Sequence, residues 1–256
     1  MQQGKGKLTL PNGTQYLGEF KENFYHGKGT LTLSDGRKYV GDFKQSHFHG
    51  KGIHSWPDGS KYEGDFIDSN FHGKGNYTAE NGRTYVGDFE NDKQNGHGEL
   101  TLPNGSHYIG QMKDDKKHGS GEFTWSDMHY VGEFQDDKAN GKGVMTWPDG
   151  KRYAGMVREE VPHGKGELTF PDGGKYIGHF QAGLYQGVGT LTKPDGWHYT
   201  GAFFNNHMHG DGVVTFPDGT VYTGKHRESA ITGKGELVFP DKSRYTGEFK
   251  NFQKHG

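Results

Sequence analysis

Short segments in which apolar and polar residues alternate dominate the chain. In residues 29–33 (GTLTL), glycine and the leucines fall on one side and the threonines on the other. Residues 39–43 (YVGDF) alternate in the same way, with tyrosine, glycine and phenylalanine on one side. A period of two is typical of a β-strand with one packed face. The pattern therefore predicts two short strands, at 29–33 and at 39–43.

The same two strands recur along the whole sequence. Each copy carries a Tyr-x-Gly-x-aromatic motif, and eleven residues after its tyrosine a second motif begins, mostly His-Gly-x-Gly. A Pro-Asp/Asn-Gly motif stands just before the next tyrosine. Three motifs held in phase predict one structural unit stacked into a repeat array. The tyrosines stand at a spacing of 23 residues, with one step of 22, at Tyr16, Tyr39, Tyr62, Tyr85, Tyr108, Tyr130, Tyr153, Tyr176, Tyr199, Tyr222 and Tyr245.

The connections decide how these strands pair. Pro-Asp-Gly suits a type I turn whose glycine takes the left-handed position of a three-residue hairpin. Because both connections are short, neighbouring strands must be antiparallel. We therefore expect an all-β fold, an elongated, solenoid-like meander of stacked hairpins in one twisted and curved sheet. It should form a single continuous array over residues 1–256, with partial repeats at both ends and a one-residue deletion near 126–129.

Glycine within the strands needs a compensating contact, since it weakens a strand on its own. Gly18 lies between Tyr16 and Phe20 on the packed side, so it leaves a bare patch of backbone. An aromatic ring from the adjacent strand can lie on such a patch. The chain contains 45 glycines and 14% aromatic residues. We expect the sheet to be stabilised by rings on glycine instead of an aliphatic core.

Composition excludes several classes of protein. The chain has no cysteine, so disulfides and thiolate chemistry are absent. Its net charge of −2 gives no general attraction for nucleic acid. No segment is long and apolar enough to predict a membrane span, and nothing near Met1 predicts a signal peptide. We find no nucleophile–base arrangement and no phosphate loop, and we expect a non-enzymatic protein without a cofactor.

Together, the period and the three motifs resemble the MORN repeat (membrane occupation and recognition nexus). The resemblance runs from Gly4 to Gly256. It implies a sheet of stacked hairpins with a role in scaffolding, in cytoskeletal or ciliary assemblies, or in attachment to membranes, including binding of phosphoinositides. It also implies a cytoplasmic location. The chain departs from the pattern at 126–128 (SDM), where the turn glycine is missing, and at Met112, Val157 and His226, which replace the second aromatic residue.

Histidines recur in the second motif, but their spacing does not predict a metal site. Successive copies lie about 10 Å apart along the predicted sheet, whereas metal–nitrogen bonds are near 2 Å. We expect no metal, although the pairs His47/His49 and His207/His209 leave a weak alternative. The histidines of the motif are His26, His49, His72, His118, His163, His209 and His255.

Lysines recur in the same motif and have two interpretations. A row of ammonium groups could bind acidic lipid headgroups. Alternatively, each lysine forms a cross-strand ion pair with the acid nine residues earlier, which places Glu19 opposite Lys28. We favour the ion pairs, because the two positions change together from copy to copy. The candidate headgroup ligands are Lys28, Lys51, Lys74, Lys165 and Lys234.

Two sets of apolar residues are candidate contacts for a protein partner. The residue before the His-Gly motif should lie on a loop at one rim, where no packing demands an apolar side chain; packing on its own loop is the alternative. A second set shares the face of the leucines and could line a groove for a peptide or a helix, or simply fill positions that every copy needs. The rim set is Tyr25, Phe48, Phe71, Tyr185 and Met208, and the groove set is Trp56, Trp125, Trp147 and Phe170.

Three hypotheses for function follow. The first is a scaffold that binds protein partners along its groove and rim. The second is a module that binds phosphoinositides or acidic membranes. The third is a targeting module of a larger protein. The outer edges of the terminal strands also predict a homodimer or additional sequence, because an open strand edge can pair with another chain.

Overall fold

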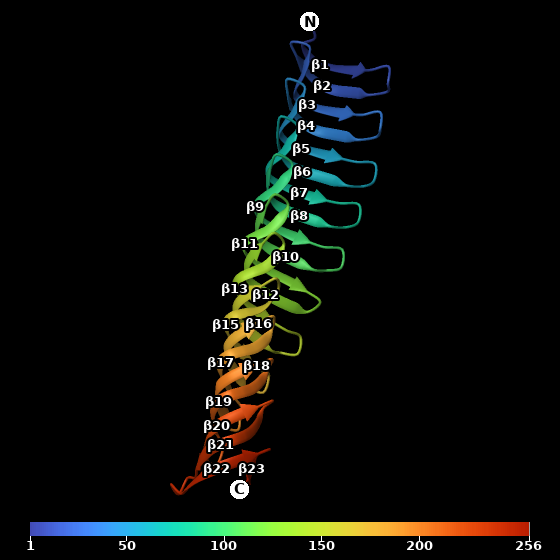
Figure 1. The fold of residues 1–256 in the computed structure, drawn as a ribbon. Coiled ribbons are helices and arrows are strands. Elements are labelled where there is room, and N and C mark those ends of the chain that lie inside the picture. Colours follow the sequence, from blue (N-terminus) through green and yellow to red (C-terminus); the bar gives the residue numbers. More distant parts are fainter. Residues whose placement is uncertain (256) are drawn as a thin grey trace. The chain divides into compact units, whose positions relative to one another are not determined.

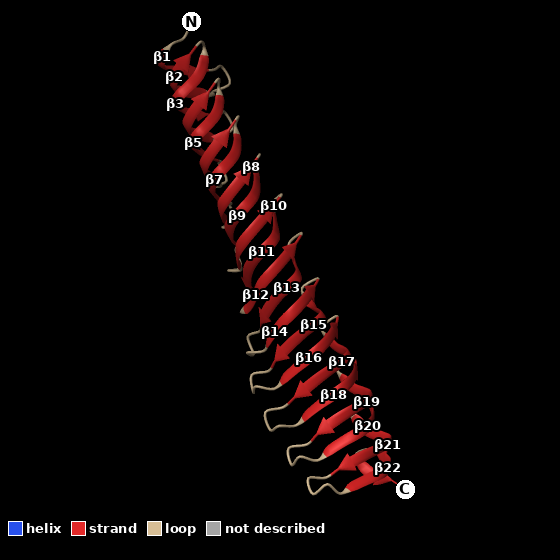
Figure 2. Cartoon of the chain, turned by 90° about the vertical axis from the view of Figure 1, so that its left-hand side faces the viewer, coloured by secondary structure: helices blue, strands red, loops and turns tan. Residues whose placement is uncertain are grey.

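The computed structural model describes residues 1–255, which form twenty-three β-strands and no helix (Figure 2). The chain divides into two compact units, which are described separately. Unit 1 is Met1–Ser126 with Gln135–Asp137, and unit 2 is Asp127–Phe134 with Lys138–Gly256. The single continuous array expected from the repeats stays a prediction.

The strands of unit 1 follow one another in chain order (Figure 1). They are β1 (Gly4–Thr9), β2 (Gln15–Lys21), β3 (Phe24–Thr32), β4 (Lys38–Lys44), β5 (His47–Ser55), β6 (Lys61–Ile67), β7 (Asn70–Thr78), β8 (Thr84–Glu90), β9 (Lys93–Thr101), β10 (His107–Lys113) and β11 (Lys116–Trp125). Those of unit 2 are β12 (Met128–Gln135, with its last residue in unit 1), β13 (Lys138–Thr146), β14 (Arg152–Arg158), β15 (Val161–Thr169), β16 (Lys175–Gln181), β17 (Leu184–Thr192), β18 (His198–Phe204), β19 (His207–Thr215), β20 (Val221–Arg227), β21 (Ala230–Val238), β22 (Arg244–Lys250) and β23 (Gln253–His255).

Within each unit, consecutive strands pair antiparallel, as in β3 with β4 and β15 with β16. The predicted all-β meander of hairpins is confirmed. The predicted Pro-Asp-Gly turn is also confirmed. The N–H of Gly59 donates to the carbonyl of Trp56 at 3.1 Å, and Gly59 has a φ of 90°.

The other connection is tighter than the sequence suggested. Glu22 and Asn23 form a two-residue turn with φ values of 54° and 69°, and β3 begins directly after it. Two consecutive positive φ values define the type I′ hairpin turn, whose twist matches that of the strands. The next repeat reinforces this end of the sheet. The N–H of Ser46 donates to the carbonyl of Tyr25 at 2.9 Å, and the N–H of Tyr25 donates to the hydroxyl of Ser46 at 3.0 Å.

The repeat tyrosines lie on glycine, as predicted. A Cβ added to Gly29 would stand 2.5 to 2.8 Å from the hydroxyl and ring carbons of Tyr16, so only glycine fits beneath the ring. The hydroxyl of Tyr16 donates to the carbonyl of Glu19 at 2.8 Å and lies 3.4 Å from that of His26. Burial raises the pKa of Tyr16 to about 12. The ring thus joins two strands by packing and by hydrogen bonds.

Each sheet has two different faces. The tyrosine face carries the repeat tyrosines and the aromatic residue four positions later. Phe43, for example, meets Tyr39 edge to face at 5.0 Å. Tyr62, Tyr85, Tyr108 and Tyr153 are 0% exposed on this face. The lysine face is the opposite one and carries Lys28, Lys51 and Lys74 with the residues that alternate with the tyrosines.

Candidate functional site

The lysines of unit 1 form ion pairs, but with different acids from those predicted. Lys28 faces Asp42 on the following strand, and its ammonium lies 2.8 Å from the carboxylate. Lys51 pairs with Asp65 at 2.8 Å, and Lys74 pairs with Asp88 at 2.7 Å. The predicted partner of Lys28, Glu19, faces His26 instead. A register shift between Gly18 and Glu19 causes this correction, because Gly27 and Lys28 are left out of the pairing and every later residue pairs two positions further along.

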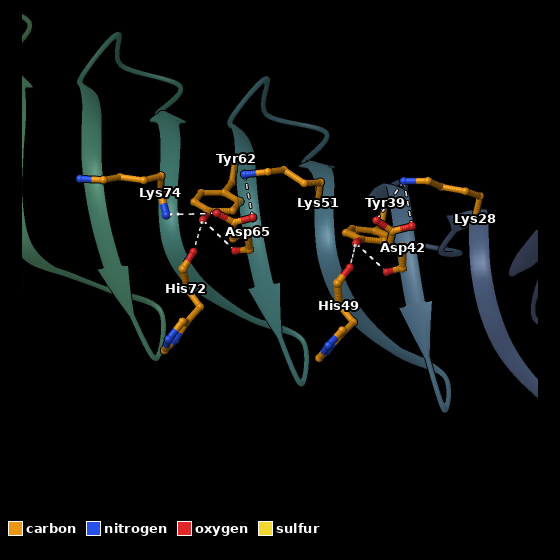
Figure 3. A network of polar contacts seen from close by, with 9 residues as sticks. All are labelled: Lys28, Tyr39, Asp42, His49, Lys51, Tyr62, Asp65, His72 and Lys74. Carbon is orange, nitrogen blue, oxygen red and sulfur yellow. Dashed lines mark hydrogen bonds and ion pairs between the residues drawn. The ribbon is translucent and has the colours of Figure 1, made fainter.

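Two acids of this row, Asp65 and Asp88, contact both neighbouring strands, as Figure 3 shows for Asp65. Asp65 accepts the ion pair from Lys51 on one side, and on the other it accepts the backbone N–H of Lys74 at 3.3 Å. Asp88 binds Lys74 and accepts the backbone N–H of His97 at 2.9 Å. Burial raises the pKa of Asp88, but these hydrogen bonds and the nearby ammonium outweigh it and lower the pKa overall.

We expect the two members of such a pair to differ in their effect on stability. Lys51→Met should lower the free energy of unfolding by less than about 1 kcal/mol, because the ammonium is exposed. Asp65→Ala should cost about 1.5 kcal/mol, because it also removes an acceptor for a backbone N–H. Urea denaturation of both variants checks this, and equal losses would contradict it.

An open hollow of about 1260 Å³ lies on the lysine face of unit 1. Exposed aliphatic side chains line it, including Leu17 (61% exposed), Val40 (41%) and Val86 (51%). Ile53 and the paired lysines of β3, β5 and β7 also line it, as do backbone glycines of the strands. None of these aliphatic residues is among the predicted site residues. Their signal is the residue directly after the repeat tyrosine, which is aliphatic in many copies, at Leu17, Val40, Val86, Ile109, Val131 and Ile177.

The predicted rim residues lie on strands and not on loops. Tyr25, Phe48 and Phe71 follow the tight turns and stack on the repeat tyrosine of their own hairpin, each with ring centroids 3.8 Å apart. Tyr185 stacks in the same way at 3.7 Å, and Met208 is buried. The alternative of local packing therefore describes these side chains. A role in partner binding stays a prediction for the half-buried rings.

The four residues of the predicted groove set do not line the unit 1 hollow, which is on the other face. Trp56 lies on the tyrosine face, where its ring centroid is 4.2 Å from that of His54. Trp125 stacks on Phe123, with ring centroids 4.8 Å apart. Trp147 and Phe170 precede Pro-Asp-Gly turns, and each donates its N–H across the turn. Binding through these residues stays a prediction.

In unit 2, two lysines at the same motif position have no acid opposite them on the following strand. Lys142 faces Met156, and Lys165 faces His179, so neither has an acid opposite. Lys234, by contrast, faces Glu248. Within residues 1–255, no group of three histidine, aspartate or glutamate side chains could hold a metal ion, and no helix is long and apolar enough to cross a membrane.

Strands and turns of this kind define a β-hairpin repeat protein. A family model described as the MORN repeat matches ten consecutive segments, and the chain belongs to this family. The segments are residues 1–15, 16–36, 39–61, 62–82, 85–107, 108–127, 130–152, 153–175, 176–198 and 199–221.

Comparison with solved structures finds weaker likenesses. The TCP domain of SAS-4 (dCPAP) from Drosophila melanogaster, in complex with a proline-rich motif of Ana2 (dSTIL), is 13% identical, with a TM-score of 0.38 over 60% of this chain and 85% of that one. The TCP10 domain of Danio rerio CPAP, in complex with a peptide of Danio rerio STIL, is 16% identical to this chain. The TM-score is 0.32, and the match covers 96% of this chain and 99% of that one. TM-scores this low support no argument about function. None of the curated proteins compared with the chain matches it.

Proposed function

We propose that this protein is a non-catalytic scaffold and that the unit 1 hollow binds an apolar peptide segment of a protein partner. The exposed aliphatic row is the observation that supports this proposal. Val40 and Val86 have no packing role that requires an aliphatic side chain, since the tyrosine face alone carries the buried rings. Exposed apolar residues grouped in a hollow are typical of interaction sites.

The charges around the hollow favour a protein over an acidic lipid. Lys28, Lys51 and Lys74 each lie against a carboxylate, so this part of the lysine face presents both signs of charge in balance. A lipid headgroup would have to compete with those carboxylates. A peptide can place its apolar side chains on the aliphatic row and its own polar groups against both signs. A cytoskeletal, ciliary or membrane-associated assembly is part of this proposal.

The test is selection from a displayed library of peptides. We expect peptides rich in apolar residues to be enriched on the wild-type protein and to lose binding at least tenfold to a Val40→Glu/Ile53→Glu variant. Both positions line the hollow, and Val40 is exposed. Because Val40 and Ile53 face each other across β4 and β5, the two charges will weaken this strand pairing locally, and circular dichroism checks that the variant is folded.

Ile67→Glu is the matched control. Ile67 is 44% exposed, but it lies at the end of β6, outside the residues that line the hollow. This control should retain binding. Peptides that bind the Val40→Glu/Ile53→Glu variant as tightly as the wild type would place the binding site elsewhere.

A further inference from the structure

Strands β13 to β16 of unit 2 repeat the lysine row without its acids. Lys142 on β13 faces Met156 on β14, and Lys165 on β15 faces His179 on β16. Three lysines at the same position in unit 1 each face an aspartate with which they form an ion pair. This stretch of sheet therefore has the lysines of the motif without the carboxylates that face them in unit 1.

Met156 occupies the place that an acid takes in unit 1. A Cβ added to Gly164 would stand 3.5 Å from the Cβ of Met156, just as one added to Gly73 would stand 3.2 Å from the Cβ of Asp65. The backbone geometry is thus the same at both places. Only the side chain differs, with an uncharged thioether where unit 1 has a carboxylate.

A hollow of about 440 Å³ opens between the two lysines. Its lining consists of Lys142, Lys165, Met156, Val144 and two strand glycines. Met156 is 39% exposed, so an apolar surface is available to a ligand at the base of the hollow. We call this site the unit 2 hollow. It combines two cations with an apolar floor.

Of the two acids near these lysines, one is already paired and one lies beside Lys142. On the same face of strands β12 to β16, Glu167 is bound by Lys175 at 3.0 Å, and that ion pair lowers the pKa of Glu167. Glu133 lies beside Gly141, one residue before Lys142. Arg152 adds a further cation on β14. The basic side chains of this face thus outnumber the acidic ones.

We infer that the unit 2 hollow binds an acidic peptide segment with two carboxylates about three residues apart and an apolar side chain between them. Lys142 and Lys165 stand two strands apart, which is about 10 Å. In the polyproline II conformation, which has three residues per turn and rises about 3.1 Å per residue, side chains three residues apart lie on the same side and about 9 Å from each other. Each carboxylate can then reach one ammonium, while the intervening apolar side chain contacts Met156.

A peptide fits this charge pattern better than a membrane surface does. The loops at one end of these strands expose Glu159 and Glu160, and the loops at the other end expose Asp149 and Asp172. Glu159 is paired with Lys138 and Asp149 with Lys151, so an anionic membrane lying across the face would meet these pairs and the acids Glu160 and Asp172 before it met the lysines of the hollow. A peptide that lies over the middle of the strands contacts the lysines and avoids the loops.

The test uses a fluorescein-labelled peptide with the sequence Glu-Leu-Ser repeated four times and fluorescence anisotropy at low salt. We expect the wild-type protein to bind it, and a Lys142→Met/Lys165→Met variant to bind it at least tenfold more weakly. Met156→Asp restores the acid of unit 1 and should weaken binding by a similar factor. Added salt should weaken binding to the wild type, because exposed charges are screened.

Lys28→Met/Lys51→Met is the matched control, because it removes two lysines from the same motif position where each has an aspartate. This control should bind the peptide as the wild type does. Equal loss in both double variants, or no binding by the wild type, would overturn the inference. So would binding of phosphatidylserine vesicles that requires Lys142 and Lys165 while the peptide does not bind.

This inference is independent of the unit 1 hollow. The Val40→Glu/Ile53→Glu variant should bind the acidic peptide normally, so failure of one proposal leaves the other standing.

Discussion

Gly75→Ala should lower the free energy of unfolding by about 3 kcal/mol, the upper part of the range for overpacked sites. A Cβ at Gly75 would meet the ring of Tyr62, with its Cζ only 2.6 Å away, and Gly75 has a φ that any residue can adopt. The whole loss therefore comes from displacing the ring. Tyr62 is 0% exposed and stacks on Phe71, so it has no free direction in which to move.

Three further variants isolate the contact between ring and glycine. Gly82→Ala places a methyl group in open space at a φ of 83°, so it should cost only about 1 kcal/mol of backbone strain. Tyr62→Ala alone should cost about 4 kcal/mol, but adding Gly75→Ala to it should cost almost nothing more, because the obstructing ring is gone. Urea denaturation measures all four proteins. Strictly additive losses would show that ring and glycine do not act together.

The sequence alone predicts most of the local structure. Tyr-x-Gly-x-aromatic and Pro-Asp-Gly each carry their own physical reason, since a ring needs bare backbone and the turn needs a left-handed glycine. Repetition then extends each local result along the chain. Gly29 beneath Tyr16 and the turn at Gly59 are examples in which the predicted contact or conformation is found.

The charge pairs show where a pattern of period two fails. The alternation of residues 39–43 assigns Asp42 to the correct face, but it carries no information about the bulge between Gly41 and Asp42. Two unpaired residues of β5, Gly50 and Lys51, change the partner of every later position. The tight turn at Glu22 and Asn23 was missed for a related reason. Neither residue is glycine, so nothing in the pattern marked two positive φ values.

The residues of the unit 1 hollow were not predicted because they lie on the face that the alternation pattern marks as polar. Alternation places Leu17, Val40 and Val86 on the polar side, where apolar residues draw no attention. The predicted groove residues, three tryptophans and Phe170, lie on the tyrosine face near the turns. Only the structure shows that the aliphatic residues of successive repeats come together on the lysine face, because cross-strand neighbours depend on register.

His226→Phe should raise the stability of unit 2 and remove part of its dependence on pH. His226 is 2% exposed and stands where most repeats have phenylalanine, between Tyr199 and Tyr222. Among the described residues, neither ring nitrogen has a hydrogen-bond partner. Removing unsatisfied buried nitrogens should raise the free energy of unfolding at pH 7 by roughly 1–2 kcal/mol.

Burial lowers the pKa of His226 below its ordinary value of 6.5, and the nearby backbone of Gly224 and Gly210 and the charge of Asp211 oppose this only in part. The unfolded chain therefore binds a proton at a higher pH than the folded protein does. The stability contributed by the neutral ring is present above about pH 6.5 and is lost as the pH falls toward the folded pKa, by about 1.4 kcal/mol for each unit of difference.

Denaturation curves between pH 7.5 and 5 compare the wild type with His226→Phe and with His179→Asn, which changes an exposed histidine on the lysine face. The stabilising effect of His226→Phe should grow as the pH falls, whereas His179→Asn should follow the wild type. The remaining histidines are common to all three proteins, so any contribution they make cancels in the differences. A constant difference between His226→Phe and the wild type would mean that His226 binds its proton equally well in the folded and unfolded chains.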